Sequence, residues 1–359
     1  MRVARRLGAL GAAYETLRST GPRYVARRLL RDALLRRSGA SRAQGVYHAI
    51  WGEAARELGA EVRELPGGAL EIRKGAVVTT VIDHRVPLDA GPASGAGKGA
   101  GLEALRDAGL SVPESIEFDA TDVQPALDFL ARSGSPTVVK PVGSGGGKGI
   151  TTGIRRRQEL ERAAARAARF SPRLLIERQA DGDAYRFLVL DGELIDVIRR
   201  RAPRLSGDGR RSVRRLIAAE NRRRQAAAGA AGWAVLKADL DAVLTLERQG
   251  LTLASVPSAG HVFQVKTVNN QTRPEDSETV REPIAADLRE EVLAAAATSG
   301  LRLAGVDVVT RDLGRPLRKS GGVILEVNRD PSPHHHYHVV DPAGATRVAV
   351  PILRRLLSA

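Results

Sequence analysis

Three oxygen-bearing side chains near the C-terminus have the types and spacing of a divalent-cation site. Glu326 and Asn328 lie two apart in the apolar run that begins at Val323, which is typical of a buried strand. Side chains two apart in a strand point to the same face. Asp307 lies in a second apolar run, and pairing of the two strands would bring all three together. Mg²⁺ is usually held by carboxylates and nucleotide phosphates, so the pattern predicts a site for phosphate chemistry.

The alternative for Asp307 and Glu326 is that each is an ordinary polar residue at a strand end. Charged groups in apolar strands are, however, usually paired or liganded, because burying an uncompensated charge is costly. The two segments together therefore favour a cation site.

A lysine followed by a glycine-rich turn is a second group suited to phosphate. Lys140 closes an apolar run, and the turn after it contains Gly143, Ser144, Gly145, Gly146, Gly147, Lys148 and Gly149. Glycines let backbone N–H groups approach phosphate oxygens closely. The turn is not a Walker A motif, because Gly149 stands where that motif has serine or threonine. It is either a phosphate cover or a solvent-exposed turn.

Glu177 ends another apolar run. The backbone of Arg178 and Gln179, which follow it, is placed to hydrogen-bond the edge of a nucleotide base. A single acid at a strand end is a weak signal, and it gains meaning only beside the other groups.

Three arginines lie on a hairpin that Asp191-Gly192 predicts, at positions 186, 200 and 201. A guanidinium group suits a carboxylate or a transferring phosphoryl group. The alternative for each arginine is an exposed ion pair.

Four histidines follow the strand that carries Asn328, at positions 334, 335, 336 and 338. Neutral imidazoles bind transition metals, act as bases for an attacking amine, or line a substrate pocket. Because no regular ligand spacing indicates zinc, we assign His335 and His336 to the substrate. A plain loop is the alternative.

The composition excludes several classes of protein. The 359 residues include no cysteine, which rules out disulfides, thiolate zinc sites and cysteine nucleophiles. There is no run of 18 apolar residues and no signal-peptide core, so we expect a cytoplasmic protein without a transmembrane segment.

The formal net charge is +15, and much of it lies in the first 45 residues, where eleven arginines face two acids. This arm has the pattern of a basic amphipathic helix. It would contact nucleic acid, an anionic surface or an acidic partner, or pack as a solvated helix on its own domain or on a second subunit of a homo-oligomer.

The helix and strand patterns indicate an α+β protein with antiparallel strands. We expect the basic helical arm over residues 1–45, a small N-terminal α/β domain over 46–95, a lobe with the glycine-rich turn over 96–175, and a larger lobe with the metal site over 176–359. A glycine-rich connector around Lys98 marks the second boundary.

Taken in order, these motifs resemble the ATP-grasp superfamily of carboxylate–amine ligases. The motifs are Lys98, Val138-Val-Lys-Pro141 with its glycine turn, Ile176-Glu177, Arg186, Gly305-Val-Asp307 and Leu325-Glu-Val-Asn328. Further segments, such as Val256-Pro-Ser-Ala-Gly260, are similar to the ATP-grasp portion of cyanophycin synthetases, over roughly residues 98–357. No counterpart of the Mur-ligase-like half of those enzymes is seen.

The resemblance implies ATP between two α+β lobes and a carboxylate activated as an acyl phosphate, which an amine then attacks. It implies nucleotide contacts from Lys98, Lys140, Gly143 to Gly149, Glu177, Arg178, Gln179 and Asp183. It also implies that Asp307, Glu326 and Asn328 hold two Mg²⁺, or Mn²⁺. We expect Arg201, with Arg186, to stabilise the acyl-phosphate transition state. Asn269, Asn270, His335 and His336 are expected near the substrate.

Two departures from the family pattern bear on the nucleotide or hairpin contacts and on the acceptor substrate, in that order. Ala184 directly precedes Tyr185-Arg186, and Asp183 lies one place earlier than the usual acid. The serine-threonine-glycine-glycine segment is replaced by Asn270 to Ser277. We therefore expect amide formation between an amino-acid or peptide carboxylate and an amine in specialised metabolism. The alternatives are a nucleotide-binding or nucleic-acid-associated scaffold with a vestigial site, or a small-molecule kinase.

Overall fold

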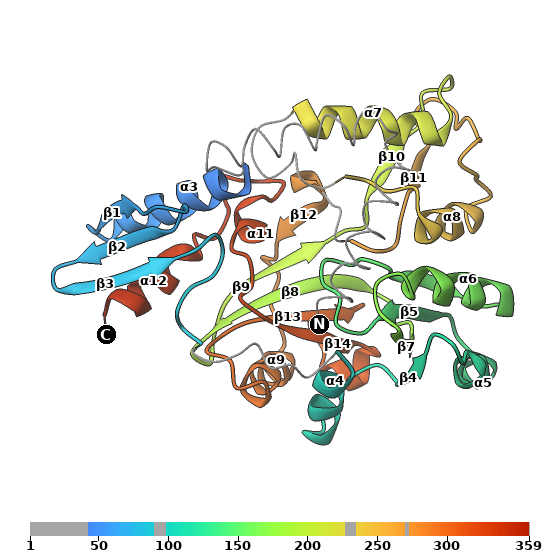
Figure 1. Ribbon diagram of the computed structural model, residues 1–359, viewed down its shortest axis with the longest axis horizontal. Helices are drawn as coiled ribbons and strands as arrows, with labels where there is room; N and C mark the ends of the chain where they lie inside the picture. Colours follow the sequence, from blue (N-terminus) through green and yellow to red (C-terminus); the bar gives the residue numbers. More distant parts are fainter. Residues whose placement is uncertain (1–41, 90–97, 227–234, 270–272, 359) are drawn as a thin grey trace.

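The computed structural model describes residues 42–89, 98–226, 235–269 and 273–358 (Figure 1). The predicted basic arm lies almost wholly outside these ranges, as does Asn270. Within the described part of the chain, no helix is long and apolar enough to cross a membrane.

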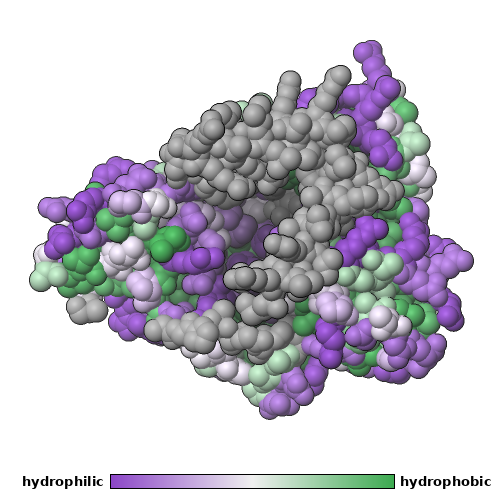
Figure 2. Space-filling view, viewed as in Figure 1, coloured by the Kyte–Doolittle hydropathy of each residue, from purple (hydrophilic) through white to green (hydrophobic). Residues whose placement is uncertain are grey.

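The N-terminal unit is a three-stranded antiparallel sheet covered by two helices from opposite ends of the chain. It comprises α3 (Arg42–Glu57), β1 (Glu61–Glu64), β2 (Leu70–Lys74), β3 (Val77–Val81) and the C-terminal α12 (Ala349–Leu357). Its core includes Trp51, Ile72 and Leu353, all almost fully buried. On the face shown in Figure 2, hydrophilic and hydrophobic residues are interspersed over this unit.

A four-stranded antiparallel sheet, in the order β4-β7-β5-β6, forms the smaller lobe. Its elements are β4 (Ser115–Asp119), α5 (Gln124–Ser133), β5 (Thr137–Pro141), β6 (Thr151–Ile154), α6 (Arg157–Ala167) and β7 (Arg173–Arg178). One face packs Val139 and Ile176 against the helices. Because side chains alternate along a strand, Val138, Lys140 and Glu177 lie on the opposite face.

A five-stranded antiparallel sheet, in the order β12-β9-β8-β13-β14, forms the larger lobe. Its strands are β8 (Asp183–Leu190), β9 (Glu193–Arg200), β12 (Ser277–Thr279), β13 (Leu303–Thr310) and β14 (Val323–Arg329). The helices α4 (Lys98–Asp107) and α9 (Ala286–Thr298) cover the face that carries Phe187 and Val306. The short helices α10 (Leu317–Ser320) and α11 (His334–Tyr337) complete this lobe.

A further unit joins the two lobes. It consists of β10 (Arg204–Ser206), α7 (Val213–Ala226), α8 (Leu240–Glu247), β11 (Val262–Gln264) and the 3-10 helix η2 (Pro274–Asp276). Its own core includes Ile217, Leu236 and Phe263. In Figure 1 this unit lies beside α6 and above the two lobes. We call it the bridging unit.

Two buried aspartates fix the bridging unit to the smaller lobe. Asp241 accepts hydrogen bonds from the backbone and hydroxyl of Thr152 in β6, at 2.9 and 2.7 Å. Asp239 accepts from Arg166 of α6 at 2.8 Å and from Lys266 at 2.6 Å. Together, Arg166 and Lys266 outweigh the effect of burial and lower the pKa of Asp239.

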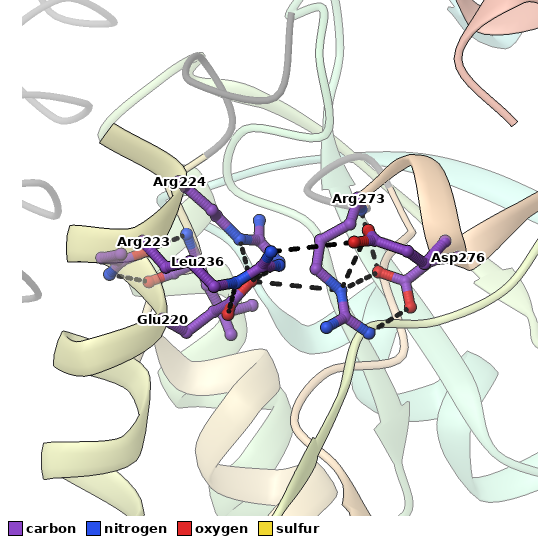
Figure 3. A network of polar contacts seen from close by, with 8 residues as sticks. Glu220, Arg223, Arg224, Leu236, Arg273 and Asp276 are labelled. Carbon is purple, nitrogen blue, oxygen red and sulfur yellow. Dashed lines mark hydrogen bonds and ion pairs between the residues drawn. The ribbon is translucent and has the colours of Figure 1, made fainter. Parts of the chain in front are cut away.

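An ionic network within the bridging unit holds α7 to the segment from Arg273 to Asp276, which adjoins the larger lobe (Figure 3). Glu220 on α7 pairs with Arg224 at 2.7 Å, and Arg273 pairs with Asp276 at 3.1 Å and with Glu220 at 4.0 Å. The Asp276 carbonyl accepts from the backbone N–H of Arg201, just after β9. The two lobes are thus connected through one polar scaffold.

The α+β class predicted from the sequence is confirmed, including the hairpin at Asp191-Gly192. The domain limits stay predictions. Strand β7 runs across the division expected between residues 175 and 176, and α4 packs on α9 and β14 of the larger lobe.

Candidate active site

A cleft of about 1100 Å³ lies between the four-stranded sheet of the smaller lobe and the five-stranded sheet of the larger lobe. Residues of β5, β7, the glycine turn, β8, β9, β13 and β14 line it. The bridging unit contributes Thr245 and Arg248, and the loop after β3 contributes His84. The two lobes, the bridging unit and the N-terminal unit therefore all border one space.

Lys140 and Glu177 lie on the floor of the smaller lobe and pair with each other. Their Nζ and Oε2 atoms are 2.6 Å apart, and both side chains are buried. The pair follows from the register, in which Val138 on β5 stands opposite Glu177 on β7. A buried carboxylate requires a partner, and Lys140 supplies it while still lining the cleft.

The glycine turn divides into a part that faces the cleft and a part that packs inward. Gly143 to Gly147 line the cleft, whereas Lys148 and Gly149 do not. Gly149 has φ +77°, and a Cβ there would stand 2.8 Å from the Phe170 ring. Gly149 is therefore required for packing.

The segment after Glu177 lines the cleft, but two of its backbone donors are already used. The Arg178 N–H donates to the Glu114 carbonyl at 2.9 Å, and the Gln179 N–H donates to the Pro136 carbonyl at 2.8 Å. The Gln179 side chain accepts from the Gly153 N–H at 2.7 Å. Ala180 is the next backbone position in this wall.

Three ionisable side chains stand in one row across the larger sheet. Arg186 on β8 pairs in register with Asp307 on β13, which pairs with Glu326 on β14. The Arg186 guanidinium donates to Asp307 through two of its nitrogens. Nε donates to Oδ1, and Nη2 donates to Oδ2 at 2.7 Å. Burial works against the charge of Arg186, but Asp307 and Glu326 outweigh it and raise its pKa.

Asn328 lies beside this row. Its Nδ2 donates to the Gly305 carbonyl at 3.2 Å and to Asp307 at 3.3 Å. The structure thus brings together the three residues predicted as metal ligands. Over the described ranges no group of three His, Asp or Glu side chains is arranged to hold a metal ion. Any ion here would need the amide and a phosphate besides the two carboxylates, which is the usual provision for Mg²⁺.

Arg200, rather than Arg201, is the hairpin arginine that faces the cleft. Its Nη2 donates to the Asn269 carbonyl at 3.3 Å, and its buried Nε has no hydrogen-bond partner among the described residues. Burial, followed by the nearby Arg186, lowers the pKa of Arg200 to about 10. Arg201 is half exposed and pairs with Glu278 at 2.8 Å, so it does not line the cleft.

Two of the remaining predicted residues have clear positions. Asp183 is exposed, lies 3.4 Å from Arg199 and is not among the cleft residues. Asn269 lines the cleft, and its Nδ2 donates to the Arg200 carbonyl at 3.1 Å. Lys98 is the first residue of α4, and its side chain lies outside the described part of the structure.

The histidines separate by position. His335 lines the cleft. His336 is buried against β9, where its Nδ1 lies 2.6 Å from Asp196, so it is not placed at the substrate as predicted. His334 is held by the Tyr47 hydroxyl at 3.0 Å from its Nδ1. Burial lowers the pKa of all three, and that of His334 falls to about 3.

Sequence reasoning missed two cleft residues from unexpected elements, His84 and Arg248. His84 follows a strand of the N-terminal unit, and no local pattern links it to residues 250 positions later. Arg248 ends α8, in a stretch that showed no strong periodicity. Alternation along β9 was the signal that separates Arg200 from its neighbours, because only one of two adjacent strand residues faces a given side.

Comparison with known proteins gives sequence and structural matches. Residues 98–184 match the family model described as carbamoyl-phosphate synthase L chain, ATP binding domain. Cyanophycin synthetase from Synechocystis sp. is 34% identical over 266 residues, which cover 70% of this chain and 29% of that protein. The glutathione biosynthesis bifunctional protein GshAB of Mannheimia succiniciproducens is 28% identical, over 63% of this chain and 31% of its own length. A crystal structure of a bifunctional glutathione synthetase from Pasteurella multocida has a TM-score of 0.53 and 22% identity, over 85% of this chain and 43% of that one.

The cleft between two α+β lobes and these matches place the chain in the ATP-grasp superfamily. Within it, the sequence is similar to part of the cyanophycin synthetases, as the motifs predicted. The chain spans less than a third of the length of these relatives.

Proposed function

We propose that this protein is an ATP-dependent ligase that joins an amino-acid or peptide carboxylate to an amine through an acyl phosphate. One observation carries the proposal. A single cleft holds the Arg186–Asp307–Glu326 row on one wall and Lys140 with the glycine turn on the other. Opposed cations and carboxylates across a nucleotide-sized space are what phosphoryl transfer to a carboxylate requires.

The smaller lobe would bind the nucleotide. Lys140 presents its ammonium to the phosphates while Glu177 fixes its position, and Gly143 to Gly147 offer backbone N–H groups from above. Because the Arg178 and Gln179 N–H groups are engaged, we assign the base edge to the backbone around Ala180. Lys98 keeps its predicted role at the phosphates.

The donor set of Asp307, Glu326 and Asn328 fits Mg²⁺. Arg186 occupies one side of the Asp307 carboxylate, which has further lone pairs, and the amide oxygen of Asn328 remains after its nitrogen turns to Asp307. Bound Mg²⁺ supplies positive charge to the transferring phosphoryl group. Arg186 orients the Asp307 carboxylate and prevents two adjacent acids from repelling each other.

Arg200 takes the role that the sequence had assigned to Arg201. It is a partly buried cation that lines the cleft, and its buried Nε has no hydrogen-bond partner among the described residues, so an anion in the cleft would compensate its charge. We assign to it the substrate carboxylate and, after phosphoryl transfer, the acyl phosphate. Asn269 positions the guanidinium through its carbonyl.

The test supplies ATP, Mg²⁺ and a mixture of the common amino acids, with and without hydroxylamine. A ligase of this type releases ADP and phosphate, forms new amide products by mass spectrometry, and yields hydroxamates when hydroxylamine intercepts the acyl phosphate. A stable phosphorylated product without amide or hydroxamate would instead establish a small-molecule kinase. No ATP-dependent product with any acid would remove the ligase assignment.

The proposed partners are therefore small molecules or peptides, and we propose a cytoplasmic location, where ATP is available. Self-association and contact of the basic arm with nucleic acid or an anionic surface stay predictions.

A further inference from the structure

One end of the cleft is lined by imidazoles that the nucleotide chemistry does not use. His335, from α11, and His84, from the loop after β3, both line it, and Asp330 stands in the same wall. The N-terminal unit and the larger lobe thus meet at this end.

The packing behind His335 fixes its position. The rings of His334 and His335 have centroids 3.9 Å apart, and the Tyr47 ring lies 5.6 Å from both His334 and His84. Since His334 is also bonded to the Tyr47 hydroxyl, helix α3 anchors the imidazole that supports His335. His336, on the next position, is held by Asp196. Of the three consecutive histidines, His335 is the one aimed at the cleft.

The charges that face His335 come from β8, β9 and α11 itself. Burial lowers its pKa most, and His334, Arg200, Arg186 and His336 lower it further. His335 is therefore uncharged at neutral pH, with a lone pair available in the cleft. Arg200, which opposes its protonation, is the group we assign to the acyl phosphate, so a bound anion would offset that cation and make His335 more basic.

We propose that His335 is a catalytic residue that accepts a proton from the amine. The inference rests on the proposed ligase function. The acceptor enters as an ammonium ion, His335 removes one proton, and the amine lone pair forms the C–N bond at the acyl carbon. The C–O bond to phosphate breaks, phosphate leaves, and the second proton of the amine passes to the released phosphate. His84 lines the same end of the cleft as His335.

The experiment compares two nucleophiles on the His335→Asn variant. Hydroxylamine is largely uncharged at neutral pH and needs no base. The α-amino group of a peptide has a pKa of about 7.7–8.0, and the amine of a free amino acid is more basic still, so both are largely protonated. We expect amide formation from the amino-acid mixture to fall about 100-fold, the usual lower range for lost base catalysis, while hydroxamate formation stays within about 3-fold of wild type. Raising the pH should recover part of the amide rate in the variant, because a larger fraction of the amine is then uncharged.

His338→Asn is the matched control. This imidazole belongs to the same cluster, with its ring 5.9 Å from that of His334, but it does not line the cleft. It should leave the ratio of amide to hydroxamate unchanged.

Two results would overturn the inference. If His335→Asn lowers amide and hydroxamate formation equally, the residue is structural and the ligase assignment still stands. If it lowers neither, His335 takes no part. A wild-type protein that forms no hydroxamate with any acid would overturn the proposed function, and this inference with it.

Discussion

The two faces of the five-stranded sheet are built from the same strands and have opposite properties. Toward the helices, β8 presents Tyr185, Phe187 and Val189 to a dry core with α9. Toward the cleft, the same strand presents Arg186 to Asp307. Adjacent residues of β8 therefore serve different purposes, since one packs in the core and the next lines the cleft. A shift of the strand register by one residue would place the core residues in the cleft and the cleft residues in the core.

The helix-covered face should govern folding. Phe187→Ala removes a fully buried ring and should cost about 3–5 kcal/mol of unfolding free energy, measured by urea denaturation. The remaining folded protein should bind ATP with unchanged affinity, because the ring points away from the cleft. A variant of normal stability that cannot bind ATP would break the comparison.

The cleft face should govern the reaction. Glu326→Gln should lower ATP-dependent hydroxamate formation by about 1000-fold. The change removes one carboxylate of the proposed metal site, and with it charge stabilisation of the transferring phosphoryl group. Glu278→Gln, at the edge strand, removes a partner of Arg199 and Arg201 and should change the rate by less than about 3-fold. If Glu326→Gln and Glu278→Gln lowered the rate equally, the cleft face would not be the part of the sheet that governs the reaction.

Two adjacent arginines sharpen the comparison further. Arg200→Gln should lower the rate by about 100-fold, since one charged donor at the acyl phosphate is lost. Arg201→Gln should leave it within about 3-fold, because Arg201 is about half exposed and pairs with Glu278 away from the cleft. The rate of steady-state ADP release measures both variants. A larger loss of rate in Arg201→Gln than in Arg200→Gln would favour Arg201, the residue predicted from the sequence.

Low pH should reduce the stability of the folded protein through the buried histidines at one end of the cleft. The pKa of His334 in the folded protein is about 3, below the value of about 6.5 in an unfolded chain. The unfolded state therefore binds more protons below pH 6.5, so the stabilisation is complete above that pH and is lost as pH falls toward 3. For His334 the loss is on the order of 1 kcal/mol per pH unit within this window. The melting temperature should fall from pH 7 to pH 4, and His334→Phe should flatten that slope.

Much of the site was visible in the sequence because it depends on local alternation. The pairing of Asp307 with Glu326, the strand ending in Lys140 and the hairpin at Asp191-Gly192 all follow from apolar runs and turn residues. The sheet order, which places β8 between β9 and β13, brought Arg186 onto Asp307 and required long-range pairing that no local pattern contains.

The elements that were missed are short, polar or held by distant partners. Strand β1 is exposed at every position, so it has no apolar alternation to recognise. Helix α8 is capped at its N-terminus by Asp239, whose pairing with Arg166 and Lys266 is a tertiary effect. Arg200 is the last residue of β9 and pairs with Ser277 of β12, a long-range contact that the sequence around Arg200 and Arg201 does not reveal.

The attachment of the bridging unit limits how the cleft opens. Thr152 and Arg166 tie it to one lobe through Asp241 and Asp239, while Asp276 meets the backbone just after β9 of the other. If the lobes move apart to admit a nucleotide, either the chain must bend on one side of the bridging unit, or the hydrogen bonds that hold the bridging unit to one of the lobes must break. A solvent-hidden carboxylate without its cation is unfavourable, so bending is the easier route, and the scaffold should swing with the smaller lobe as one body.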